Sequence, residues 1–145
     1  MEESKEPLGE ILIKRGIIKP EQLTQALEIQ KKDKGLIGEV LLQLGFVQEI
    51  DIVVALIMQN NLPYIAVNKY DFKKEVVGLI PEETARRFHV VALEKDGLTL
   101  SVVMEDPLNQ EVRAGLEQTT KCRITPFIGA KSEIDQAINK WYAKS

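Results

Sequence analysis

Apolar residues recur along the first part of the chain in a pattern that occurs twice. Residues 8–30 align without a gap on residues 37–59, at a constant offset of 29 positions. Self-similarity of this kind indicates two copies of one structural unit. The identical pairs are Gly9/Gly38, Glu10/Glu39, Leu12/Leu41, Gly16/Gly45, Ala26/Ala55, Leu27/Leu56 and Gln30/Gln59.

Each copy predicts a short helix, a glycine stop and a second helix. Apolar residues from Leu8 onward follow the 3.6-residue spacing of a helix up to Gly16, which suits a left-handed cap. Pro20 suits the first turn of the next helix, and Gly45 takes the place of Gly16 in the second copy. The polar run 31–35 ends in glycine and predicts a connecting turn. The two copies are therefore expected to form two stacked helical hairpins.

The pattern changes at residues 60–63, where β-branched and aromatic residues replace the helical spacing. Asp96-Gly97 lies between two apolar runs and predicts a β-hairpin. The expected strands are 64–67, 88–94, 98–104 and 123–128; the expected helical segments are a turn within 72–80, a helix from Pro81, 108–116, and 132–142 with Ser132 as its N-cap. The predicted fold class is α+β, with a flexible N-terminus at 1–6, a tandem helical repeat subdomain at 7–60, and at 61–145 a small sheet covered by helices.

Composition narrows the classes of partner. The 19 basic and 22 acidic residues leave a net charge of -3 and are interspersed, so no stripe suited to DNA or RNA stands out. Apolar runs fall far short of the roughly 20 residues of a membrane-spanning helix. The acidic N-terminus lacks the apolar core of a secretory signal. We therefore expect a cytoplasmic chain without direct membrane insertion, which a partner could recruit to the inner membrane.

Few residues offer catalytic chemistry. The sequence contains neither a phosphate-binding loop nor a dinucleotide fingerprint. His89 and Cys122 are the only residues of their types, so one chain cannot assemble a zinc site or a plausible nucleophilic triad. We interpret both as structural residues in strands. The prediction is a non-enzyme with no catalytic residue, no metal site and no required cofactor.

The repeat itself supplies the candidate binding residues. Each copy places a glycine near the start of its first helix and an apolar stripe ending in glutamine on its second helix. A stripe of this kind could cover a flat heteroaromatic base, while the amide offers donors and an acceptor. The alternative is that the stripes pack the hairpins together, which is the usual role of an apolar stripe at helical spacing.

These motifs resemble the signature of the MshEN family. The first copy reads Leu8-Gly9-x2-Leu12-Ile13-x2-Gly16-Ile17-Ile18-x4-Leu23-x3-Leu27-x2-Gln30, and residues 79–88 and 104–109 are similar to further family motifs. The resemblance implies an N-terminal domain of type II secretion and type IV pilus assembly ATPases, many of which bind cyclic di-GMP through two such motifs. The candidate ligand-binding residues are Leu8, Gly9, Leu23, Leu27, Gln30, Ile37, Gly38, Ile52, Leu56, Gln59 and, by the resemblance alone, Asp106, for which a turn role is the alternative.

One departure from the family pattern orders the functional hypotheses. The family motif usually opens with arginine, but Pro7 and Leu36 occupy those positions here. Neither residue can pair with phosphate or stack on a guanine as arginine can. The first hypothesis is therefore an interaction module that docks on a secretion or pilus ATPase core or on an inner-membrane assembly protein. The second is a cyclic di-GMP receptor that binds the dinucleotide without the two arginines.

Overall fold

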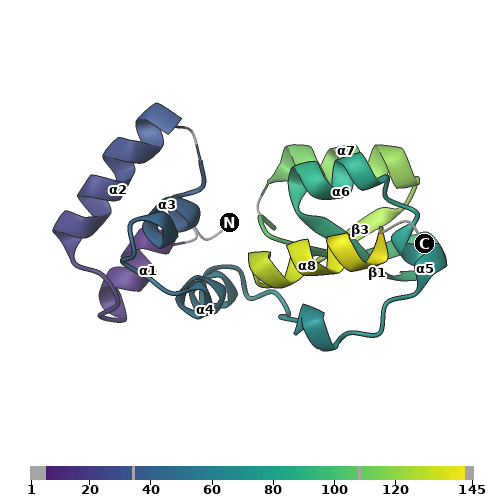
Figure 1. Cartoon of the computed structure of the whole chain (residues 1–145), viewed down its shortest axis with the longest axis horizontal. Helices are drawn as coiled ribbons and strands as arrows, with labels where there is room; N and C mark the ends of the chain where they lie inside the picture. The colour runs from purple at the N-terminus through teal and green to yellow at the C-terminus, as the bar shows by residue number, and fades with distance from the viewer. Residues whose placement is uncertain (1–5, 34, 108, 143–145) are drawn as a thin grey trace, which may run out of the picture. The chain divides into compact units, whose positions relative to one another are not determined.

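The computed structural model describes residues 6–33, 35–107 and 109–142. The chain folds as two compact units, Met1–Asn61 and Leu62–Ser145 (Figure 1). The expected flexible segment 1–6 lies, except for Glu6, outside the described residues.

In its described residues, 6–33 and 35–61, the first unit consists of four helices: α1 (Leu8–Lys14), α2 (Pro20–Asp33), α3 (Ile37–Gln43) and α4 (Glu49–Asn60). The expected caps are confirmed, since Gly16 has φ 76° and Gly45 has φ 78°, which glycine adopts without steric cost. Helix α1 lies against α4 and α2 against α3, so each long helix packs on the short helix of the other copy. The two copies therefore interlock.

Equivalent residues of the two copies build one shared core. Leu12 and Leu41, a repeat pair, are fully buried, as are Ala26 and Ala55. Small alanines at the centre allow the helices to approach closely. The remaining core residues are Ile11, Ile18, Val40 and Val47.

Helix α2 is longer than the sequence pattern predicts. It continues to Asp33, so Lys31 and Lys32 belong to the helix and the turn expected at 31–35 is wrong for its first three residues. Lysine is a good helix former, and its charge is favourable near the carbonyl end of a helix. Lys34 lies outside the described residues.

The second unit is a three-stranded sheet with helices packed on it (Figure 1). Strands β1 (Val90–Asp96) and β2 (Thr99–Met104) form the expected hairpin, with Gly97 at φ 61° in its turn. Strand β3 (Arg123–Ile128) pairs parallel to β2 after the crossover helix α7 (Gln110–Thr120). The other elements are a 3₁₀ turn η1 (Val67–Lys69), α5 (Lys74–Val77), α6 (Glu82–Phe88) and α8 (Lys131–Trp141). The α+β fold class is confirmed.

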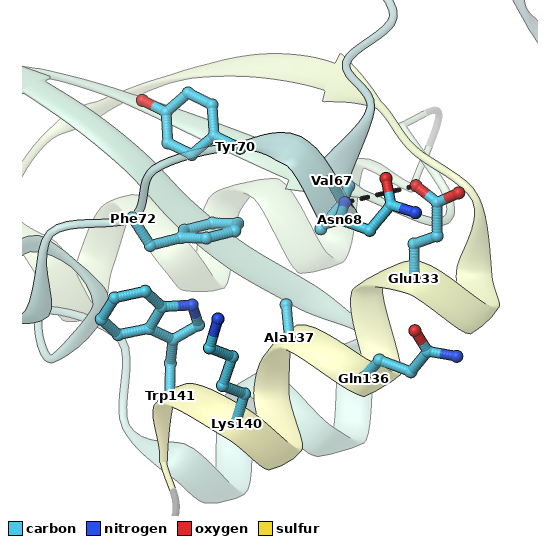
Figure 2. Close-up of a pocket in the computed structure, with 9 residues that line it drawn as sticks. All are labelled: Val67, Asn68, Tyr70, Phe72, Glu133, Gln136, Ala137, Lys140 and Trp141. Carbon is cyan, nitrogen blue, oxygen red and sulfur yellow. Dashed lines mark hydrogen bonds between the residues drawn. The ribbon is translucent and has the colours of Figure 1, made fainter.

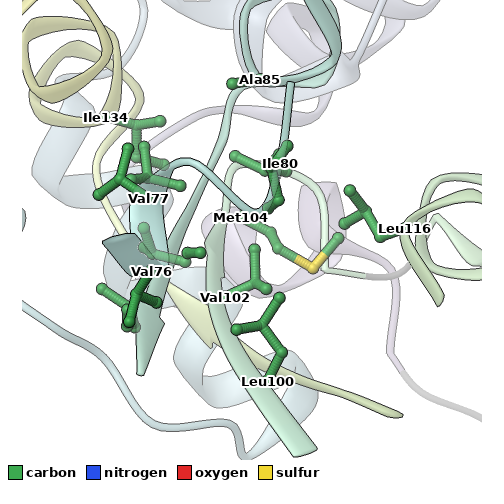
Figure 3. Packing of buried hydrophobic residues seen from close by; sticks show 14 of the residues in the cluster. Val76, Val77, Ile80, Ala85, Leu100, Val102, Met104, Leu116 and Ile134 are labelled. Carbon is green, nitrogen blue, oxygen red and sulfur yellow. The ribbon is translucent and has the colours of Figure 1, made fainter. Parts of the chain in front are cut away.

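The core of this unit lies between the sheet and its helices. Figure 3 shows Val102 and Met104 of β2 packed with Ile80 and Leu116, all of which are buried. Tyr142 closes one side, with its hydroxyl 2.6 Å from the carbonyl oxygen of Ile80. Burial raises the pKa of Tyr142 to about 12, which keeps the hydroxyl protonated as a donor.

At the start of this unit, one expected strand is absent and another begins later than expected. Residues 64–67 form no strand, because only Tyr64 makes a single bridge, to Ile128, before the chain turns into η1. The strand expected at 88–94 begins only at Val90. Phe88 ends α6, and His89 caps it at φ 55°, with Nδ1 2.7 Å from Asp135 Oδ1. This side-chain contact favours the cap over an extended backbone.

Three smaller expectations also need correction. The N-cap of α8 is Ala130, not Ser132, because the helix begins at Lys131. Cys122 precedes β3 instead of lying within it, although it is buried as expected. Helix α7 begins at Gln110, where the Asn109 side chain accepts a hydrogen bond from the Val112 amide; the earlier start expected at Leu108 lies outside the described residues.

Candidate functional site in the helical repeat

At each repeat glycine, a side chain from the second helix of the same copy lies against the backbone of the first helix. A Cβ atom on Gly9 would lie 2.6 Å from Leu23 Cδ1, far inside van der Waals contact. A Cβ atom on Gly38 would lie 3.3 Å from Ile52 Cγ2 and 3.6 Å from Leu8 Cδ2. The atom that approaches each glycine is therefore a side chain of the repeat itself, as the packing alternative requires.

The two repeat glutamines make equivalent hydrogen bonds. Gln30 Nε2 donates to the carbonyl of Gly35 at 2.9 Å, and Gln59 Nε2 donates to the carbonyl of Glu6 at 3.0 Å. Gly35 and Glu6 are themselves 29 residues apart, so the bonds obey the repeat. In each case a glutamine near the end of a long helix holds the residue that shortly precedes the short helix of the other copy.

The two positions at which the family motif usually has arginine lie at the starts of these short helices. Pro7 is the N-cap of α1 and Leu36 is the N-cap of α3, and neither side chain caps its helix. Both side chains are exposed. Neither opening position therefore carries a basic side chain.

The other candidates divide by their burial. Leu8, Leu23, Ile37 and Ile52 pack partly buried against the core of the first unit. Leu27 leaves 41% of its surface exposed, and Leu56 is half-buried. Leu27 and Leu56 occupy equivalent positions of α2 and α4. Both retain apolar surface that a ligand could cover.

Asp106 is the one candidate outside the helical repeat. It lies in the second unit after β2, and its carbonyl accepts a hydrogen bond from the Asn109 amide at 3.2 Å. This is a turn that leads into α7, in agreement with the structural alternative. The remaining ten candidates all lie in the first unit.

A second feature of the first unit was missed from the sequence. The outer face of α4 presents Ile50, Val54 and Ile57, at helical spacing, where the equivalent positions of α2 carry glutamate, glutamine and glutamate. Ile50 is 56% exposed, and so is the neighbouring Met58. We call Ile50, Val54, Ile57 and Met58 the α4 stripe. Mismatches between the aligned copies, not their matches, carry this signal.

Other chemistry is sparse in the part of the chain that the structure describes. There, no three His, Cys, Asp or Glu residues gather where they could hold a metal ion. Over the same residues, no helix is long and apolar enough to cross a membrane.

Comparison with known proteins identifies the class. The family model of the MshEN domain matches residues 60–145, more than half of the chain. The chain belongs to the MshEN domain family and is homologous to the N-terminal domains of type IV pilus and type II secretion ATPases. This match falls on the second unit, whereas the sequence motifs that first suggested the family lie mainly in the first.

Individual relatives agree with this assignment. The type IV pilus assembly ATPase PilB of Myxococcus xanthus is 31% identical over 137 residues, which cover 94% of this chain and 24% of PilB. The Thermus thermophilus PilB is 28% identical over 93% of this chain and 15% of its own length. Bacteriophage adsorption protein B of Escherichia coli is 26% identical over 95% of this chain and 18% of its own. The chain thus spans a quarter or less of these relatives.

Two solved structures share the fold. MshE with cdg superposes with a TM-score of 0.81 at 28% identity, covering 95% of this chain and all of that one. The N-terminal domain of XpsE superposes with a TM-score of 0.83 at 22% identity, covering 99% of this chain and all of that one. Both matches include the repeat as well as the sheet.

Proposed function

We propose that this domain is a non-catalytic interaction module that docks on the machinery of a type IV pilus or type II secretion ATPase and tunes it. The partner is the ATPase core or an inner-membrane assembly protein, which would also bring a cytoplasmic chain to the membrane. The α4 stripe is the observation that carries this proposal.

The repeat provides an internal control for that surface. Helix α2 has the same fold and the same place in its copy, yet it faces solvent with Glu21, Gln25 and Glu28. Packing within the first unit therefore does not require apolar residues at these positions. An apolar stripe that is exposed at Ile50 and Met58 and half-buried at Val54 and Ile57 is typical of a surface that a protein partner covers.

The control also supplies the test. Replacing Ile50→Glu, Val54→Gln and Ile57→Glu gives α4 the residues that α2 already carries. We expect the fold to persist and affinity for the partner to fall at least about tenfold, since about 1.4 kcal/mol is less than the burial of one isoleucine contributes. The measurement is biolayer interferometry against the ATPase core and the cytoplasmic part of the inner-membrane protein from the same genome.

A matched variant separates this effect from a general change of charge. Glu21→Gln with Glu28→Gln alters the polar face of α2 and should leave the affinity unchanged. Unaltered binding of the α4 variant to a partner that the wild-type protein does bind would refute the docking role of the stripe. Failure of the wild-type protein to bind either partner would refute the proposed function itself.

A second function is favoured by one comparison. Cyclic di-GMP, which the abbreviation cdg denotes, accompanies MshE, a structure with a TM-score of 0.81 to this chain. The paired Gly9/Leu27/Gln30 and Gly38/Leu56/Gln59 sets support a two-copy site for such a dinucleotide. When the dinucleotide binds, each glutamine amide would either keep its hydrogen bond to the backbone carbonyl or replace it with a hydrogen bond to the ligand.

Calorimetric titration with cyclic di-GMP tests this second function, with GTP and cyclic di-AMP as controls. Restoring the opening residues as Pro7→Arg and Leu36→Arg should strengthen binding, by about 1 to 3 kcal/mol for each phosphate or base contact regained. Both side chains are exposed and make no cap, so the fold tolerates the changes. Absence of heat from both the wild-type protein and the double-arginine variant would exclude the receptor.

A further inference from the structure

The second unit contains a groove that neither proposed role uses. It lies between α8 and the segment from η1 to Phe72, and encloses about 200 Å³ (Figure 2). Figure 2 shows Phe72 and Trp141 on one side and Glu133 at the other end. Five lining residues come from one face of α8, so the groove follows the axis of that helix.

The floor of the groove is apolar and held in place. Val67, Phe72 and Ala137 are buried beneath it. The ring of Phe72 packs edge-on against Tyr70 with centroids 4.8 Å apart, and lies 5.8 Å from the ring of Trp141. Tyr70 is fixed in turn, because its hydroxyl donates to the Leu93 carbonyl at 2.9 Å. The aromatic wall is therefore formed before any partner binds.

The rim carries opposite charges at its two ends. Glu133 and Lys140 are seven residues apart on α8, or roughly 10 Å along a helix with a rise of about 1.5 Å per residue. Lys140 Nζ lies 5.6 Å from the centroid of the Trp141 ring. At the other end, the Glu133 carboxylate accepts a hydrogen bond from the backbone amide of Asn68. A ligand that fits this rim needs an acidic group at the Lys140 end and a basic group at the Glu133 end.

The size of the groove determines the class of ligand. Sites that bury a whole small molecule typically enclose about 300 to 1,000 Å³ and place polar groups inside. Here the volume is smaller, and the charged groups lie on the rim above an apolar floor. The space suits one leucine or phenylalanine side chain that projects from a longer segment.

We propose that this groove binds a segment of a protein partner, through one apolar anchor residue flanked by a basic and an acidic residue. This inference rests on the proposed function only in that the domain binds proteins. It adds a second contact surface, on the other unit from the α4 stripe, and specifies the chemistry of what binds there.

Trp141 is the only tryptophan of the chain, so its fluorescence reports on this groove directly. The probes are tryptophan-free alanine-based helical peptides with one central phenylalanine, and with lysine and glutamate placed seven residues apart around it. We expect a saturable change in Trp141 emission with this mixed-charge peptide. Peptides with two lysines or two glutamates should bind about three- to fivefold more weakly, as expected for exposed ion pairs. The peptide with alanine in place of phenylalanine should not bind.

A charge reversal sharpens the test. Lys140 is exposed, so Lys140→Glu preserves the fold but makes both ends of the rim acidic. This variant should prefer the two-lysine peptide by a similar factor. Lys95→Glu, an exposed change of equal charge on β1, should retain the wild-type preference. No saturable signal up to several millimolar, equal binding of the alanine peptide, or an unchanged preference in Lys140→Glu would each overturn the inference.

Three further outcomes can be told apart. If sedimentation shows that the wild-type protein is a dimer that Lys140→Glu dissociates, a second copy occupies the groove and the inference is wrong. If the peptides fail while the α4 stripe variant still loses partner affinity, the inference falls but the proposed function stands. Peptide binding together with an unaffected stripe variant would support the groove and refute the docking role of the stripe.

Discussion

The two copies of the repeat agree where they face each other and differ where they face outward. Leu12 and Leu41 occupy equivalent positions and are both fully buried. Glu21 and Ile50 are also equivalent, and both are exposed, but one is charged and the other apolar. The inner positions are constrained by packing, whereas exposed positions such as Glu21 and Ile50 are not and can differ between the copies.

This difference indicates that the two copies of the repeat share one structural role but have different surface roles. The shared core keeps similar inner residues in both copies, identical at Leu12/Leu41 and Ala26/Ala55 and smaller by one methylene at Val40 and Val47 than at Ile11 and Ile18, because a large change of volume would disturb both copies. The surface has no such requirement. We infer that α2 keeps the unit soluble, while α4 provides the contact surface. Three pairs of substitutions test how far the symmetry extends.

The largest expected effect is in the shared core. Leu12→Ala and Leu41→Ala should each destabilise the first unit by about 2 to 5 kcal/mol, through lost burial and the cavity that remains. Because the two residues face one core, the two losses should agree within about 1 kcal/mol. Urea denaturation of each variant measures this, with Ile134→Ala as a control in the core of the second unit. A large disparity would show that the copies are not equivalent inside.

The glutamine bonds should give a smaller effect. Gln30→Ala and Gln59→Ala each remove a part-buried hydrogen bond to a backbone carbonyl, at a cost of about 1 kcal/mol. The bond of Gln59 joins residues 53 positions apart, so its loss should also increase hydrogen exchange at the start of α1. Gln59→Glu, which keeps the size but places a carboxylate against the carbonyl oxygen of Glu6, should destabilise the protein at least as much as the alanine variant. Wild-type stability in both alanine variants would contradict the structural role of the amides.

The smallest effect should distinguish the two glycines. Alanine at Gly38 meets Ile52 at 3.3 Å and gains helix propensity, whereas alanine at Gly9 meets Leu23 at 2.6 Å and forces that side chain to move. Gly38→Ala should therefore be more stable than Gly9→Ala by about 0.5 kcal/mol. Thermal unfolding of the two proteins under identical conditions provides the comparison. The opposite order would mean that Leu23 relaxes more easily than Ile52.

Local signals predicted much of this fold. Gly16 and Gly45 ended helices because only glycine adopts their backbone conformation without cost. Asp96-Gly97 marked the hairpin for the same reason. The errors arose where a distant residue decides the local structure. His89 leaves the strand pattern and makes a side-chain contact with Asp135, 46 residues away, which no local pattern reveals.

The candidate site shows the same limit. The sequence repeat singled out Gly9 and Gln30 as candidates. It could not show that the Leu23 side chain lies against Gly9, or that the Gln30 amide donates a hydrogen bond to a backbone carbonyl. The groove of the second unit was beyond sequence analysis, because Phe72 and Trp141 meet only in the folded chain. The α4 stripe, by contrast, was readable in the sequence as a set of differences between two aligned copies.

The paired glutamine bonds also bear on the evolution of the unit. A glutamine near the end of α2 bonds to the segment before α3, and its equivalent near the end of α4 bonds to the segment before α1. Open repeat arrays can gain or lose units because each end is free to stack another. Here both ends are used within the pair, so the copy number is held at two. A gene encoding one copy would be expected to yield a symmetric homodimer, the arrangement from which fusion would produce the present chain.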